Sequence, residues 1–358
     1  MPPFSFPQLA SSIIQAPMAG SGINTTALVL EVCRAGGLGS IAGAYRTLDQ
    51  LRTDIHTVRA ATRAPFAVNI FAPVPTPPRP SDPASALALV SSWHRRFGLP
   101  EPSLPEDPTE PFDAQVALLL EERPPVVSFT FGLFPEPVVR ALHDRSIFVI
   151  GTATTVDEAL QLQATGVDAI VAQGAEAGGH RGSFTAPNHA IGTFALVPQI
   201  VDAVPLPVIA SGGIMDGRGI LAALALGASA VQMGTAFLTT HESGAPPAYK
   251  DRVLHAAATD TAFTAVFSGR VARGIVNPFL REAEAAAATL PYPWQNALTR
   301  PLRAEGVRRN IADVLSLWAG QAAPLARSES VAELMARLAA ETRAVLQHLQ
   351  STSPSPDR

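Results

Sequence analysis

The chain has 358 residues, of which 47% are apolar and only 16% charged, against about 25% charged in an average soluble domain. This apolar content excludes an intrinsically disordered chain, and the net charge of −4 argues against nucleic acid as a partner because there is no excess of basic residues to bind a phosphate backbone. The single cysteine, Cys33, excludes an intramolecular disulfide and a cysteine-based metal cluster.

The sequence contains no segment that we interpret as a signal or a membrane span. The N-terminal residues lack the basic start and the long apolar stretch of a secretory signal. Residues 219–240 carry no charge and have the length of a membrane span, but Gly227 and Gly234 divide them into a helical pattern and a strand-like pattern. We therefore expect a buried helix followed by a buried strand there, and a cytoplasmic protein without membrane contact.

Short apolar runs rich in Val, Ile and Phe alternate with helical patterns along the chain. The predicted strands are 13–18, 38–43, 66–71, 126–132, 148–152, 169–174, 207–214 and 230–238, and the predicted helices are 26–36, 47–61, 112–122, 136–144, 156–165, 193–204 and 216–226. Eight such units in about 240 residues predict an α/β fold, a parallel (β/α)8 TIM barrel. A doubly wound open sheet is the alternative, although no G-x-G-x-x-G follows the first strand.

The strand–helix alternation breaks once, between the third and fourth strands. Residues 73–111 contain 11 of the 33 prolines, so they cannot form one regular helix or strand, although residues 83–97 fit a short helix. An insertion after a barrel strand lies near the C-terminal face, where active sites form, so this segment is a candidate rigid lid. The alternative is a surface loop without a role in the active site. The barrel itself would then comprise residues 1–72 and 112–277.

The pattern changes again after the eighth strand. Residues 278–350 predict an appended, interrupted helical element, with apolar or alanine-rich runs at 281–290, 310–320 and 329–349. Residues 351–358, which contain two prolines and no large apolar side chain, predict a disordered tail.

Two glycine-containing turns follow the seventh and eighth predicted strands. Ser211, Gly212 and Gly213 precede a helix, and Met233, Gly234 and Thr235 follow the next strand. Barrels often hold a phosphate between the loops at these two positions, where glycines allow close approach and backbone N–H groups bind anions. The pair therefore predicts a phosphate site, with tight turns that bind nothing as the alternative.

The loop after the sixth strand carries the best candidate for acid–base chemistry. His180 lies in a glycine-rich segment directly beyond that strand, whereas His56, His143 and His255 lie in helical patterns. Histidine titrates near neutral pH, which suits general acid–base catalysis. Gln173 and Asn69, each at a predicted strand end, are suited to bind the edge of a ligand ring. No cluster with metal-ligand spacing is present, so we expect no metal site.

Several segments together resemble the nitronate monooxygenase family, formerly called 2-nitropropane dioxygenases. In chain order they are QAPMAG at 15–20, GGLGS at 36–40, VNIF at 68–71, SFTFG at 128–132, AQGAEAGGHRGSF at 172–184, ASGGIMDGRG at 210–219, VQMGTAFL at 231–238 and SGRVARGIVN at 268–277. The resemblance extends over about residues 13–303, and it implies a TIM barrel that binds FMN noncovalently.

The resemblance also implies roles for individual residues. His180 matches the catalytic histidine of the family, and a late segment at 290–303 resembles its substrate lid. The implied FMN-binding residues are Pro17, Met18, Ala19, Asn69, Gln173, Gly178, Gly179, Ser211, Gly212, Gly213, Gln232, Met233, Gly234 and Thr235. The implied substrate-side residues are Tyr292, Tyr249 and Arg300, and the arginine favours an anionic substrate unless it is simply a solvated charge.

The implied reaction is the oxidation of an alkyl nitronate by O2 to a carbonyl compound and nitrite, through a flavin semiquinone. A nitroalkane or propionate 3-nitronate are further candidate substrates, with His180 acting as a base or as a substrate-orienting group. An NAD(P)H-dependent FMN reductase, such as an enoyl-acyl carrier protein reductase, is the first alternative. A flavin-binding protein without turnover is the second, and a homodimer is a further expectation.

Overall fold

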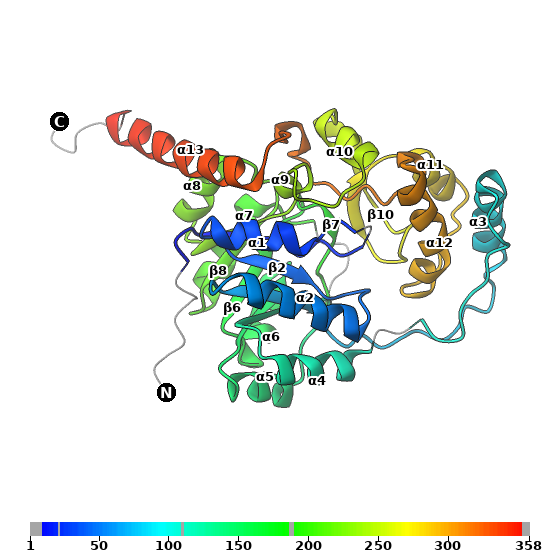
Figure 1. Cartoon of the computed structure of the whole chain (residues 1–358), viewed down its shortest axis with the longest axis horizontal. Coiled ribbons are helices and arrows are strands. Elements are labelled where there is room, and N and C mark those ends of the chain that lie inside the picture. The colour runs from blue at the N-terminus through cyan, green and yellow to red at the C-terminus, as the bar shows by residue number, and fades with distance from the viewer. Residues whose placement is uncertain (1–8, 21, 109–110, 186–189, 353–358) are drawn as a thin grey trace.

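Eight parallel strands form the centre of the fold in the computed structural model, which describes residues 9–20, 22–108, 111–185 and 190–352 (Figure 1). They are β1 (Ile13–Gln15), β2 (Gly39–Ala42), β3 (Phe66–Phe71), β4 (Val126–Thr130), β5 (Phe148–Ala153), β6 (Ala169–Gln173), β8 (Val208–Ser211) and β9 (Ala230–Met233). The strand order is β1-β9-β8-β6-β5-β4-β3-β2, and Leu38 beside β2 exchanges backbone hydrogen bonds with Ile13 and Gln15 of β1. This bridge closes the barrel, so the predicted TIM barrel is confirmed.

The helices between the strands begin close to the predicted positions. They are α1 (Thr26–Arg34), α2 (Leu48–Ala61), α4 (Phe112–Glu122), α5 (Glu136–His143), α6 (Val156–Ala164), α7 (Thr193–Ala203) and α8 (Gly217–Ala225). Thr25, Thr47, Thr155 and Asp216 precede four of them, and each side chain accepts a hydrogen bond from a backbone N–H of the first turn. These caps explain the helix starts, because Thr and Asp satisfy donors that have no partner within the helix. Cys33 is buried in α1, as a small apolar residue would be.

One predicted strand is too long, and one predicted helix is absent. The predicted strand 230–238 ends at Met233, and a short helix, α9 (Thr235–Leu238), follows it. Residues 310–320 form only the 3-10 turn η2 (Ala312–Val314) instead of a helix. The cause is long-range pairing: Ile275 N donates to Leu317 O, and the Asn277 amide donates to the Ala312 and Leu315 carbonyls. These bonds hold the segment extended against a distant strand and override its helical pattern.

A second, three-stranded antiparallel sheet lies beyond the barrel and was not predicted. Its order is β10 (Thr261–Thr264), β11 (Ala272–Ile275) and β7 (Gly179–His180). His180 pairs with Ala272 in this sheet. The candidate catalytic residue is therefore held by a strand that lies about ninety positions later in the chain.

The proline-rich insertion carries one helix, α3 (Ala84–Phe97), close to the predicted 83–97. Figure 1 shows α3 beside α12 (Trp294–Arg309), on the opposite side of the molecule from the C-terminal helix. Val90, Trp93 and Phe97 of α3 pack with residues of α11 (Pro278–Ala285) and α12. The described part of the insertion is thus bound mainly to the C-terminal helical element.

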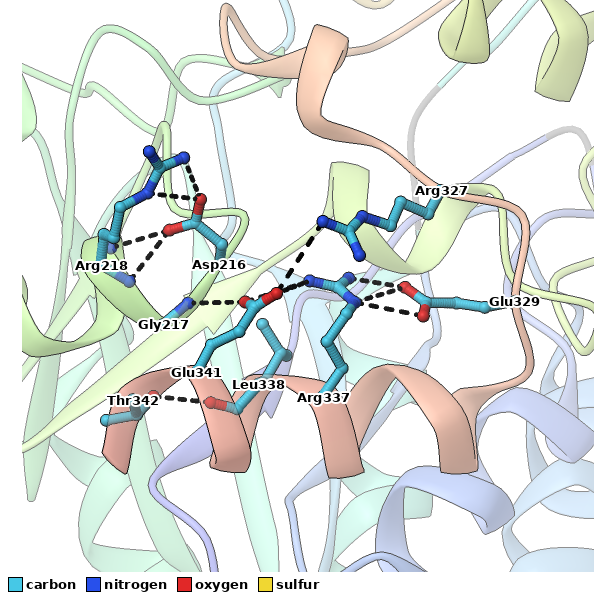
Figure 2. Close-up of polar contacts among 10 residues, drawn as sticks. Asp216, Gly217, Arg218, Arg327, Glu329, Arg337, Leu338, Glu341 and Thr342 are labelled. Atoms are coloured by element: carbon cyan, nitrogen blue, oxygen red, sulfur yellow. Dashed lines mark hydrogen bonds and ion pairs between the residues drawn. The ribbon is translucent and has the colours of Figure 1, made fainter. Parts of the chain in front are cut away.

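The C-terminal helix α13 (Val331–Thr352) packs on the barrel through buried Leu334, Met335 and Leu338. Figure 2 shows Arg337 between Glu329 and Glu341, with its guanidinium 2.6 Å from Glu329 and 3.1 Å from Glu341. Glu341 also accepts the Gly217 N–H at the start of α8. The predicted tail at 351–358 is wrong for residues 351 and 352, which belong to α13, and residues 353–358 lie outside the described part of the chain.

Candidate functional site

A pocket lies at the C-terminal ends of the barrel strands, where TIM-barrel enzymes carry their active sites. Asn69, Ser128, Thr152, Gln173 and Ser211 line it from the ends of β3, β4, β5, β6 and β8. The structure brings together all of the residues that the sequence assigned to the cofactor. Those on the pocket wall are Pro17, Met18, Ala19, Asn69, Gln173, Gly178, Gly179, Ser211, Gly212, Gly213, Gln232, Met233, Gly234 and Thr235.

One end of the pocket is formed by the two glycine turns. The backbone N–H groups of Gly212, Gly213, Gly234 and Thr235 donate to no group in the described part of the chain. Gly212 has φ +125°, and a Cβ there would lie 2.7 Å from the hydroxyl of Thr193. Only glycine fits this conformation and this space, and the four free N–H groups are suited to bind an anion.

The Gln173 side chain orients the loop that carries the histidine. Its amide nitrogen donates to the His180 carbonyl over 3.0 Å, and its amide oxygen accepts the Gly182 N–H over 2.8 Å. At Gly178 a Cβ would lie 2.5 Å from the carbonyl carbon of Ala319, so the loop and the C-terminal segment approach each other too closely for a side chain. This close contact explains why a glycine occupies position 178.

The imidazole of His180 lies on the pocket wall between two aromatic rings. The ring centroids of Phe131 and Trp318 lie 5.7 Å and 5.4 Å from its own, both edge to face. Its Nε2 lies 2.8 Å from the Ser268 hydroxyl, whereas Nδ1 has no hydrogen-bond partner among the described residues. Burial lowers the pKa of His180 to about 3, and the charge of Arg270 acts in the same direction. The imidazole is therefore neutral at pH 7 in this environment.

Three arginines lie near the pocket although they do not line it, and the charges of Arg270 and Arg303 act on His180. The Arg270 guanidinium stacks 4.1 Å from the Phe131 ring, and the exposed Arg300 lies 5.2 Å from the ring of Tyr45, which lines the pocket. Arg303 donates to the Asn296 carbonyl and side chain, but its Nε is buried without a partner in the described residues. Burial lowers the pKa of Arg303 to about 10, which leaves it charged at neutral pH.

The three predicted substrate-side residues occupy different places. Tyr249 lines the pocket, but its hydroxyl donates to the Trp318 carbonyl over 2.7 Å, and this bond gives it a packing role. Tyr292 lines a neighbouring cavity, with its ring 6.5 Å from that of Phe131. Arg300 is exposed and lines neither cavity, but its guanidinium lies 5.2 Å from the ring of Tyr45, which lines the pocket.

Sequence reasoning missed several residues of the site. Phe131, Ser268, Arg270, Arg303 and Trp318 act on His180, and Tyr45 lines the pocket. Phe131, Ser268 and Arg270 belong to the segments SFTFG and SGRVARGIVN, which were noted only as parts of the resemblance. Within the described residues, no group of three or more His, Cys, Asp or Glu side chains could hold a metal ion, and no helix is long and apolar enough to cross a membrane.

Comparisons with known proteins agree with this arrangement. A probable nitronate monooxygenase of Staphylococcus haemolyticus is 43% identical over 339 residues, which cover 93% of this chain and 94% of the relative. The solved nitroalkane oxidase from Streptomyces ansochromogenes is 38% identical with a TM-score of 0.89, covering 95% of this chain and 98% of that one. FabK from Thermotoga maritima is 30% identical with a TM-score of 0.76, covering 97% of both chains. The family model for nitronate monooxygenase matches residues 7–341, so the chain belongs to the nitronate monooxygenase family and is an oxidoreductase.

Proposed function

We propose that this protein binds FMN and oxidises alkyl nitronates with O2 to a carbonyl compound and nitrite. Membership of the family implies a flavin. The observation that carries the proposal is that one pocket holds His180 on its wall and four free backbone N–H groups at its end. A phosphate-bearing cofactor and an acid–base group would thus meet in one cavity.

The residues on the pocket wall fit a flavin mononucleotide. The free N–H groups of Gly212, Gly213, Gly234 and Thr235 would hold the phosphate, as expected from their sequence positions. The strand-end side chain of Asn69 and the segment 17–19 would contact the ring. When bound, the flavin supplies the electron acceptor for the substrate and the electron donor for oxygen.

His180 would act through its neutral imidazole. If Ser268 donates its proton to the Arg270 carbonyl, 3.1 Å away, Nε2–H donates to Ser268 and the lone pair of Nδ1 is the acceptor. In this tautomer Nδ1 can accept the carbon-bound proton of a neutral nitroalkane. If Ser268 instead donates to Nε2, Nδ1–H can donate to a nitronate oxygen. The negative charge of a bound nitronate would raise the pKa of His180 and favour this second role.

The arginines on the His180 side favour an anionic substrate with a second negative charge, such as propionate 3-nitronate. Arg303 is half-buried, and its Nε is buried without a described partner, so it is suited to bind a carboxylate. Arg270 adds a second half-buried positive charge next to Phe131. Partly buried charges act more strongly on a substrate anion than charges in open solvent.

The proposal is tested by incubating the purified holoenzyme with propyl-2-nitronate, 2-nitropropane or propionate 3-nitronate and measuring nitrite. We expect nitrite well above the protein-free rate, and His180→Asn should impair 2-nitropropane most, because only the neutral substrate needs a base. The proposal fails if no substrate yields nitrite above that rate. Extraction of the bound flavin and measurement of its mass then show whether it is FMN.

The likeness to FabK keeps a reductase as the second candidate. Anaerobic mixing with NADH or NADPH separates the two functions, because rapid bleaching of the flavin would support the NAD(P)H-dependent FMN reductase. A yellow protein inert towards both sets of reactants would support flavin binding without turnover. A homodimer and a cytoplasmic location stay predictions, which gel filtration and cell fractionation test.

A further inference from the structure

A second cavity of about 170 Å³ lies next to the catalytic pocket. It is bounded by the C-terminal end of β3, the first residues of the proline-rich insertion, the start of α4 and the turn before α12. Phe71 and Phe131 line both this side cavity and the catalytic pocket. The other residues that line the side cavity are Ala72, Pro73, Val74, Pro75, Thr76, Phe112, Gln115, Tyr292 and Pro293.

The wall between the two cavities is a pair of phenyl rings held in place. The rings of Phe71 and Phe131 touch, with centroids 4.6 Å apart. Phe131 is 4% exposed and also contacts His180, Tyr292 and Arg270. Its φ of +78° is a conformation that bulky residues rarely adopt, so the surrounding contacts fix its position at some energetic cost. The wall is therefore closed at the point where it contacts His180.

The side cavity also carries a hydrogen-bonding group. Gln115 of α4 is 2% exposed, and its amide nitrogen has no partner among the described residues. A void left by imperfect packing is normally lined by apolar groups alone, because a buried donor without a partner costs free energy. A mostly apolar cavity that also carries the amide of Gln115 is suited to hold an alkyl chain, including one that ends in a hydrogen-bond acceptor.

We propose that Phe71 and Phe131 set the length of the substrate chain, by closing the catalytic pocket against a side cavity that could hold a longer alkyl group. The proposal rests on the function proposed above, since it concerns the chain attached to the nitronate carbon. In the wild-type enzyme, methylenes that would extend past the wall gain no favourable contact, so longer chains are not preferred. Removing the Phe71 ring joins the cavities and converts the enzyme to one that prefers longer chains.

The test compares wild type with Phe71→Ala and the milder Phe71→Val, using ethylnitronate and hexylnitronate. The matched control is Phe263→Ala, because Phe263 is a partly buried phenylalanine that lines neither cavity. Each methylene that enters the side cavity should raise kcat/KM about fourfold, so four methylenes give up to about 250-fold. We expect the hexyl-to-ethyl ratio of kcat/KM to rise at least about tenfold in the Phe71 variants, and not in the control.

A binding measurement keeps this inference separate from the proposed reaction. Butanoate and octanoate are planar anions of similar shape to nitronates and are not oxidised, and calorimetry gives their dissociation constants with the holoenzyme. The octanoate-to-butanoate affinity ratio should rise in the Phe71 variants and stay low in wild type. An unchanged ratio in both folded variants, or an equally high ratio in wild type, would overturn the inference. A rise in this ratio without any nitrite would support the side cavity and refute the proposed reaction.

Discussion

The buried carboxylate of Glu158 offers a sharp test of how the segment after His180 is held. Glu158 is fully buried, and one of its oxygens accepts the Thr154 N–H and hydroxyl over 2.6 and 2.8 Å. Its other oxygen accepts the backbone N–H groups of Phe184 and Thr185 and the hydroxyl of Ser183. Residues 183–185 lie directly after the His180 segment, and the Ser183 carbonyl accepts a hydrogen bond from Arg270. The carboxylate therefore fixes residues 183–185, which follow His180 closely.

Replacing Glu158 by Gln keeps the shape and removes the charge. If the Gln side-chain oxygen keeps the bonds from Phe184 and Thr185, its NH2 group faces the Thr154 N–H. The Thr154 N–H then loses its acceptor, at a cost of about 1–3 kcal/mol. The two N–H bonds from Phe184 and Thr185 lose their charge assistance, at about 1 kcal/mol each. The total is about 3–5 kcal/mol, a large part of the 5–15 kcal/mol that is typical of folded proteins. Glu158→Gln should also lower kcat/KM, because the loop beside His180 is no longer fixed.

Urea unfolding of wild type, Glu158→Gln and the control Glu121→Gln measures the effect. Glu121 pairs with Arg52 on the surface and is largely exposed, so its substitution should change the stability little. Equal unfolding midpoints for the two variants would refute the reasoning.

The pH dependence of the unfolding free energy tests the same carboxylate in a second way. Burial alone would raise the pKa of Glu158, but hydrogen bonds from Thr185, Phe184 and Thr154 outweigh it and lower the pKa below the usual 4.5. The folded protein thus binds this proton less readily than the unfolded chain. The stability that Glu158 contributes is present above pH 4.5 and is lost as the pH falls through the folded pKa. The difference between wild type and Glu158→Gln should shrink over that range.

Three further substitutions test the site. Ser268→Ala removes the partner of His180 Nε2 and should lower kcat for neutral nitroalkanes by roughly tenfold, the value of about one hydrogen bond, with a smaller effect on preformed nitronates. Gly212→Ala should reduce the flavin-to-protein absorbance ratio, whereas Gly98→Ala, which has φ +67° but nothing near its Cβ, should leave that ratio unchanged. Arg303→Met should raise KM for propionate 3-nitronate roughly 10- to 100-fold, which is the value of a hydrogen bond to a charged group. KM for ethylnitronate, which has no carboxylate, should change much less. Equal effects on both substrates would contradict a carboxylate-binding role.

The barrel could be predicted because its signals are local. Each barrel strand is a short apolar run buried on both faces, such as Val126–Thr130, and several helices start at a capping Thr or Asp. The glycine turns could be predicted for the same reason, since the conformation at Gly212 requires glycine whatever surrounds it. These features depend on neighbours in the sequence, and a single chain displays them directly.

The groups around His180 could not be predicted, because they come from distant segments. Ser268 is 88 positions from His180, and β7 has only two residues, too few to show a strand pattern. The pairing of Ile275 with Leu317 reversed the helical expectation for residues 310–320. A pattern in one segment carries no information on which other segment will pair with it.

The late segments also connect the two halves of the site. The Gly320 N–H donates to the Thr235 hydroxyl at one glycine turn, and the Gln321 N–H donates to the Glu176 carbonyl in the His180 loop. Trp318, two residues before Gly320, contacts the imidazole itself. The backbone of residues 318–321 thus connects the glycine turn at Thr235 with the loop that carries His180. Because this late segment contacts both halves of the pocket, changes in it should affect the glycine turn and the surroundings of His180 together.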